Sequence, residues 1–131
     1  MKSQFPSAQE YSAQTARYPA LAVVDIRAEQ AAVTESYQNQ VLLDVNNNCL
    51  RLAVFEGEYR WHHHPNSDEL FLVVAGTLQI DLVDGSRIEL TEWQSAVIPA
   101  GTMHRTRAVG RTVNITCEKN GAQIVFDETR A

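Results

Sequence analysis

The sequence predicts an all-β fold, either a sandwich or a barrel, and three patterns carry that prediction. Short runs rich in β-branched residues follow one another from Val23 onward, with turn residues between them. The dipeptides Asp84-Gly85 and Asn120-Gly121 favour hairpins, because Asn or Asp followed by Gly tolerates the positive φ of a tight turn. Apolar and polar residues alternate over residues 77–82, as expected of a strand with one face in water.

The expected strands are the runs that lie between these turn residues. They cover residues 23–27, 41–45, 50–56, 59–64, 70–75, 77–83, 87–90, 96–98, 103–107, 112–118 and 122–126. In the alternating run, Leu78, Ile80 and Leu82 form the apolar side and should face the core. Residues 69–74 are apolar on both sides, which indicates burial against either a second layer or a partner subunit. We therefore expect a homo-oligomer, taken to be a homodimer.

The length of 131 residues predicts a single domain, residues 1–131, with the barrel over residues 41–126. The N-terminal residues 1–22 have a different pattern. Tyr11 and Tyr18 recur at helical spacing among Ala and Gln residues, which favours a short helix or an arm that packs on the barrel.

Composition excludes several classes of protein. The net charge is −5 and no run of Lys or Arg occurs, which argues against a nucleic-acid or anionic-membrane partner. No apolar run approaches the roughly 18 residues that cross a bilayer, and the N-terminus lacks the apolar core of a signal peptide. Cys49 and Cys117 are too far apart for a CxxC motif, and two cysteines are too few for a disulfide scaffold. These features predict a soluble, cytoplasmic protein with reduced thiols.

Candidate functional residues concentrate around a run of three histidines. Residues two apart on an extended chain point to the same side, so His62 and His64 converge while His63 turns toward solvent or an interface. Helical zinc pairs use an i, i+4 spacing instead. Together with Glu69 and the distant His104, the pair supplies four candidate metal ligands. The alternatives are surface histidines on an exposed strand and a Glu69 that only pairs with a basic neighbour.

Three neutral imidazoles and one carboxylate suit borderline divalent ions, namely Zn, Fe, Mn, Ni or Co. An octahedral ion with four protein ligands keeps two positions open for water, substrate or oxygen. Such an ion can polarise a bound oxygen or activate a water near neutral pH. The ligand types alone do not choose among these metals.

The same residues resemble the two motifs of the cupin superfamily. The first motif, a Gly, a His-x-His pair, an acidic residue and a second Gly, is similar to Gly57, His62, His64, Glu69 and Gly76. Gly57 stands one residue closer to the first histidine than in the commonest pattern. The second motif, Pro-x-Gly-x-x-His, matches residues 99–104. Here Trp93 replaces the usual glycine before the proline, and Ala108 replaces the usual asparagine after the histidine.

This resemblance covers about residues 43–108 and implies a double-stranded β-helix, which is a jelly-roll-like barrel. The most similar members are small single-domain cupins often described as mannose-6-phosphate-isomerase-like, a label that reflects the barrel and not an activity. The resemblance also implies metal ligation by His62, His64, Glu69 and His104.

Strand alternation adds three candidate substrate-binding residues. Arg60 shares the side of His62, and we expect it either to hold a substrate carboxylate or phosphate above the metal or to pair with Glu58 or another surface acid. Phe71 and Thr106 share the inward side of the ligands and are expected to line the pocket, although Phe71 also suits a purely structural role in the core. Tyr59 and Trp61 should point the other way.

Two functions fit these residues. The first is a metal-dependent enzyme, dioxygenase-like or isomerase-like, that acts on a small polar or anionic molecule. The second is a non-catalytic cupin that binds or senses a small molecule, because no separate general base stands out. A structural barrel with an empty site is a third, weaker alternative. In both main hypotheses the partner is a small molecule rather than nucleic acid or a membrane.

Overall fold

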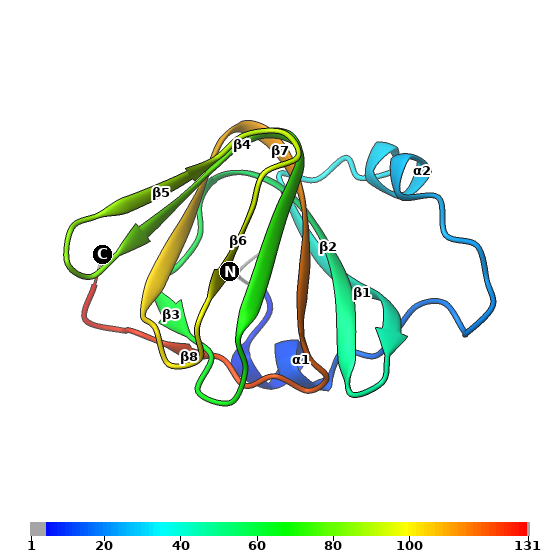
Figure 1. Ribbon diagram of the computed structural model, residues 1–131, viewed down its shortest axis with the longest axis horizontal. Helices are drawn as coiled ribbons and strands as arrows, with labels where there is room; N and C mark the ends of the chain where they lie inside the picture. Colours follow the sequence, from blue (N-terminus) through cyan, green and yellow to red (C-terminus); the bar gives the residue numbers. More distant parts are fainter. Residues whose placement is uncertain (1–4, 131) are drawn as a thin grey trace.

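Two long, bent strands organise the fold, and the computed structural model describes residues 5–130. β4 (Glu69–Leu82) and β7 (His104–Lys119) pair antiparallel from Glu69↔Glu118 to Leu82↔His104. Both strands bend where the pairing register shifts, on either side of Ala75, so each contributes to two walls of the barrel (Figure 1). The two legs of each strand diverge toward the bottom of the view, where the barrel opens.

The other elements are added to these two strands. They are α1 (Ala8–Ala13), α2 (Ile26–Ala31), β1 (Tyr37–Val45), β2 (Asn48–Glu58), β3 (His62–His63), β5 (Arg87–Leu90), β6 (Ser95–Ile98) and β8 (Val125–Phe126). β2 pairs with β7, and β1 pairs with β2. β5 and β6 pair with opposite halves of β4. β3 lies between β7 and β8 and pairs with both. All of these pairings are antiparallel. The all-β, double-stranded β-helix prediction is confirmed for residues 5–130.

The barrel has one core inside and a second one outside. The inner core contains residues such as Phe55, Phe71, Val73, Leu78 and Ile80, each at most 5% exposed. The outer core packs residues of β1, β2 and β7 against Val33, with Tyr18, Val24 and Ile26 at its edge. The N-terminal segment therefore covers one outer face of the sheet. Its backbone also adds to the edge of β1, because the amides of Arg17 and Tyr18 donate to the carbonyls of Val41 and Leu42.

Most predicted strands are present, but their ends differ. The predicted strand at 23–27 is wrong, because Asp25 caps a helix there and accepts a hydrogen bond from the amide of Ala28 at 3.2 Å. The predicted strand at 59–64 is reduced to β3. The predicted runs at 70–75 and 77–83 form one strand, β4, with Gly76 inside it at positive φ. The predicted runs at 103–107 and 112–118 likewise form one strand, β7, with Gly110 inside it at positive φ. The predicted N-terminal helix is α1, and residues 1–4 of that predicted arm, like Ala131, lie outside the described residues.

Neither helix of residues 5–130 has the length or the apolar character that a membrane crossing requires.

Gly76 is the position where the bend depends on a missing side chain. Its φ is +89°, and a Cβ there would lie 2.6 Å from Thr112 Oγ1 and 2.8 Å from the Arg111 carbonyl oxygen. Thr112 in turn donates to the carbonyl of Thr77 and accepts from its amide. Any side chain at position 76 would therefore push apart the two strands that carry the bend.

We predict that Gly76→Ala lowers the free energy of unfolding by roughly 3 kcal/mol, from positive-φ strain and overpacking together. Gly57→Ala is the matched control, because Gly57 has a φ of +87° but a Cβ there would meet no other atom within 4 Å. It should cost about 1 kcal/mol, from backbone strain alone. Urea denaturation measures both, and equal losses would contradict the idea that close packing at Gly76 sets the bend.

Candidate metal centre

The four predicted ligands meet at the open end of the barrel, three of them at the start of a strand and one directly after a strand. His62 begins β3, Glu69 begins β4 and His104 begins β7, whereas His64 follows β3 directly. One potential ligand atom from each residue lies within 4.8 Å of all the others. All four residues are at most 5% exposed. The chain therefore brings together, from three separate segments, a donor set that could hold a metal ion.

Backbone carbonyls fix the orientation of all three imidazole rings. Nδ1 of His62 lies 2.7 Å from the carbonyl oxygen of Arg60. Nδ1 of His64 lies 2.8 Å from the carbonyl oxygen of Gln123, and Nδ1 of His104 lies 2.8 Å from that of Thr102. A carbonyl oxygen only accepts hydrogen bonds, so each Nδ1 carries a proton, and each Nε2 carries a lone pair whenever its ring is neutral. This pattern holds metal-binding histidines in many proteins.

The inner atoms of the cluster have no hydrogen-bond partner among residues 5–130. These atoms are Nε2 of His64, Nε2 of His104 and Oε1 of Glu69. Glu69 Oε1 lies 3.2 Å from His64 Nε2 and 3.5 Å from His104 Nε2. Burying acceptors together without a donor is unfavourable, and a divalent cation would satisfy all of them. The residues present therefore fit a metal ion such as those expected from the sequence.

Electrostatics in the cluster distinguishes its members. Burial, together with the neighbouring His104, lowers the pKa of His62 to about 3, which keeps that ring neutral. Burial also opposes a charge on His64, but its contact with Glu69 outweighs this effect and raises the pKa to about 8. Burial would raise the pKa of Glu69, but contacts with His104 and His64 hold it well below the usual range. Glu69 is therefore an anion at neutral pH.

A small cavity of about 40 Å³ adjoins the cluster on its inner side. Its apolar wall is formed mainly by Tyr37, Phe55, Tyr59 and Phe71. Its polar wall is formed by Asn39, Thr106, Asn114 and Thr116, with His62 and Glu69 at the metal end. A molecule in this cavity would therefore contact the metal ligands and an aromatic surface at once.

The first described residues, 5–13, which include α1, lie across the open end of the barrel (Figure 1). Ser7 caps α1 by accepting a hydrogen bond from the amide of Glu10, whose side chain accepts one from the amide of Ser7. The Tyr11 ring stacks on His64 with ring centres 5.6 Å apart. The Phe5 ring lies edge-on against Tyr37 and Tyr59. The segment therefore forms part of the cavity wall rather than a free arm.

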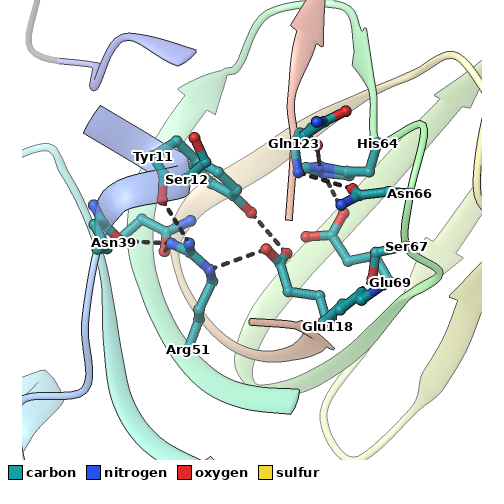
Figure 2. Close-up of polar contacts among 12 residues, drawn as sticks. Tyr11, Ser12, Asn39, Arg51, His64, Asn66, Ser67, Glu69, Glu118 and Gln123 are labelled. Atoms are coloured by element: carbon teal, nitrogen blue, oxygen red, sulfur yellow. Dashed lines mark hydrogen bonds and ion pairs between the residues drawn. The ribbon is translucent and has the colours of Figure 1, made fainter. Parts of the chain in front are cut away.

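A buried ion pair anchors this segment (Figure 2). Tyr11 donates its hydroxyl to Glu118 Oε1 at 2.7 Å, and Arg51 Nε lies 3.3 Å from Glu118 Oε2. Arg51 also donates to Gln14 and to the carbonyl of Tyr11, and its guanidinium lies 3.8 Å from the Tyr11 ring centre. Burial and the charge of Glu69 raise the pKa of Glu118 to about 7. This network was not predicted from the sequence, although Glu118 and Arg51 lie at inward alternating positions on β7 and β2.

The three expected substrate-binding residues lie in different places. Phe71 and Thr106 line the cavity. Arg60 does not line it, and its guanidinium stacks on Phe126 and pairs with Glu128 at 3.0 Å. The pairing with a surface acid, which is the alternative expected for Arg60, is therefore present, with Glu128 rather than Glu58. The substrate roles of all three residues stay predictions.

The residues next to the histidines only partly follow strand alternation. His63 is half-buried and does not belong to the cluster, as expected. The guanidinium groups of Arg105 and Arg130 each lie 5.0 Å from the Trp61 ring centre, so this ring faces away from the four-residue cluster. Tyr59 differs from the expectation, because it lines the cavity and contacts the His62 ring at 5.2 Å between centres. Residues 59–61 are not a strand, so alternation does not extend back from His62.

Comparison with known proteins identifies several relatives. A family model described as Cupin domain matches residues 51–116, which include all four residues of the cluster. "Uncharacterized protein YdbB" of Bacillus subtilis (strain 168) is 50% identical over 96 residues, 73% of this chain and 85% of that protein. "Polyketide synthase CurC" of Streptomyces cyaneus is 45% identical over 49 residues, 37% of this chain and 31% of that protein. The solved structure of a cupin-2 domain containing protein from Shewanella frigidimarina NCIMB 400 has a TM-score of 0.70 and 30% identity, over 74% of this chain and 94% of that chain.

The pKa of His64 predicts how metal affinity depends on pH. A proton competes with the metal for Nε2 of His64 at every pH below about 8. We therefore expect the apparent Kd for zinc to rise by up to about tenfold for each unit that the pH falls below that value. Competition with a chromogenic chelator measures this Kd. A Kd that stays constant between pH 6 and pH 8, after correction for the chelator, would contradict metal binding by a His64 ring whose pKa is about 8.

Proposed function

Because the chain belongs to the cupin family, we propose that it is a metal-dependent enzyme that acts on a small polar or anionic molecule inside its barrel. His62, His64, Glu69 and His104 hold the metal. The observation that supports this most directly is that Nε2 of His64, Nε2 of His104 and Oε1 of Glu69 are buried without a hydrogen-bond partner among residues 5–130. One potential ligand atom from each of the four residues lies within 4.8 Å of the others. The ion is one of Zn, Fe, Mn, Ni or Co, and the reaction is dioxygenase-like or isomerase-like.

The role of each residue follows from its contacts. A bound divalent ion would act as a Lewis acid toward a coordinated oxygen of the substrate. Glu69 contributes the one anionic ligand, and the carbonyls behind the three histidines keep their rings from rotating. Phe71 and Thr106 hold the substrate against the metal end of the cavity. Tyr11 and Phe5 exclude bulk water from the open end of the barrel.

The alternative is a cupin that binds or senses a small molecule without turnover. The small size of the cavity supports this alternative, because it leaves little room for two reactants. Glu118, a buried carboxylate whose charge affects the pKa of His64, is held by Tyr11 and Arg51 and does not line the cavity, so it is not placed as a general base. The two functions are distinguished by whether a bound molecule is converted.

Three further expectations stay proposals. Arg60 could contribute to substrate binding only by leaving Glu128. A homodimer is supported by an apolar groove outside the barrel that includes Leu72, Val74 and the exposed Trp93. A cytoplasmic location is supported by the two free cysteines.

We predict that His104→Ala loses roughly 90% or more of the metal that the wild-type protein retains, because each protein ligand supplies a large share of the metal affinity. The matched control is His63→Ala, which removes a histidine from the same segment without touching the cluster. Elemental analysis after purification without a chelating column measures both.

The same samples test the reaction. Wild-type protein and His63→Ala should convert a member of a panel of small polar metabolites, with oxygen consumption followed in parallel, and His104→Ala should not. Equal metal contents in His104→Ala and His63→Ala would contradict the role of His104 as a metal ligand. Full metal content without turnover, but with ligand-dependent thermal stabilisation, would favour the binding alternative.

A further inference from the structure

The inner face of β7 carries a polar row where a barrel core is ordinarily apolar. Thr112, Asn114, Thr116 and Glu118 alternate along the strand, and each is at most 3% exposed. The ends of the row have partners inside the protein. Thr112 bonds to the backbone of Thr77, and Glu118 bonds to Tyr11 and pairs with Arg51.

The two middle residues of the row lack such partners. Asn114 Oδ1 and Thr116 Oγ1 are fully buried and have no hydrogen bond among residues 5–130. Leaving a buried polar atom unpaired costs about 1 to 3 kcal/mol. A pair of such residues on one strand face therefore calls for a partner from outside the protein, which is either ordered water or a ligand that displaces it.

Both residues face the cavity that adjoins the metal ligands. Thr116 lies opposite Phe71 and Asn114 opposite Val73 on β4, the strand that Glu69 begins. From the metal ligands inward, the two middle residues of the polar row of β7 therefore line one wall of the cavity. A molecule that reaches the metal from this cavity lies beside Thr116 and then Asn114.

The charge of the cavity restricts what this molecule can be. No Lys or Arg is among the cavity-lining residues of the described chain, and Glu69 supplies a negative charge. The buried Arg51 is already engaged by Glu118, Gln14 and Asn39. An anionic ligand would have only the metal to balance its charge, and near Asn114 Oδ1 and Glu69 Oε1 its oxygens would face other acceptors. The Tyr59 hydroxyl, unpartnered among residues 5–130, is a hydrogen-bond donor in the same cavity, but it carries no charge.

We propose that Asn114 and Thr116 bind the substrate in this cavity alongside Phe71 and Thr106, and that the ligand is a small uncharged molecule with hydroxyl or amide hydrogen-bond donors. This inference rests on the proposed metal site and narrows its substrate class from polar or anionic to polar and neutral. The cavity volume of about 40 Å³ limits the ligand to a few heavy atoms. The aromatic wall of Phe55, Phe71 and Tyr37 covers the apolar part of the ligand.

Binding to cobalt(II)-loaded protein tests the inference, with changes in the visible spectrum of the metal as the readout. Three probes of matched size are compared: hydroxyacetone, which is neutral and has a donor, butanone, which lacks the donor, and glycolate, which is anionic. The variants are Asn114→Leu and Thr116→Val. We expect hydroxyacetone to bind wild-type protein about tenfold more tightly than butanone, and each variant to remove that advantage. Glycolate should bind wild-type protein more weakly than hydroxyacetone does, and tighter binding of glycolate would overturn the neutral substrate class.

A second readout needs no ligand and no metal. Because Thr116 Oγ1 is unpartnered, Thr116→Val should leave the Tm of the metal-free protein unchanged or raise it. Thr112→Val is the matched control on the same row, and it should lower the Tm because the Thr112 hydroxyl is bonded to Thr77.

The outcomes separate this inference from the proposed function. Failure to bind cobalt would overturn both. Three results obtained with normal cobalt binding would overturn only the substrate class. The first is equal affinity for hydroxyacetone and butanone, and the second is a hydroxyacetone affinity that the variants leave unchanged. The third is no hydroxyacetone binding at all. A loss of Tm in Thr116→Val as large as in Thr112→Val would show that Thr116 has a partner within the protein, and would also overturn it.

Discussion

The clamping of three imidazole rings by backbone carbonyls is the constraint on which the site depends. Each Nδ1–H donates to a carbonyl, so the rings of His62, His64 and His104 cannot turn their Nε2 atoms away from one another. Glu69 adds a carboxylate to the same closed space. Such a set of buried acceptors is costly by itself and favourable around a cation. The fold therefore orients this candidate cation site through its backbone as much as through its side chains.

The bends of β4 and β7 explain how distant residues reach that site. Each strand runs through two walls of the barrel, so its two ends both lie at the open end (Figure 1). Glu69 at the start of β4 and His104 at the start of β7 lie in different walls and still approach within 3.5 Å. Gly76 permits one of these bends because no side chain fits between its backbone and Thr112. Packing far from the cluster thus sets the distances within it.

Much of this arrangement could be predicted from the sequence, because strand alternation is a local property. The convergence of His62 and His64, the inward positions of Phe71 and Thr106, and the buried side of residues 78–82 all follow from a period of two residues. Alternation is lost at Tyr59, where the chain leaves the sheet before β3. The strand predicted at 23–27 is wrong for a related reason, since Asp25 favours a helix start over an extended run that has no neighbouring strand.

Interactions between distant segments could not be predicted in this way. Nothing local to Tyr11 indicates that it stacks on His64 or donates to Glu118, 107 residues along the chain (Figure 2). The polar residues Asn114 and Thr116 similarly look like the wet side of a strand until β2 and β4 close over them.

X-ray absorption of the protein as purified without a chelating step, and of protein loaded with one equivalent of zinc, measures the ligands of the metal directly. We expect a single bound ion whose scattering contains three imidazoles and one carboxylate oxygen. Fewer than three imidazoles, or a sulfur ligand from Cys49 or Cys117, would contradict the four-ligand site.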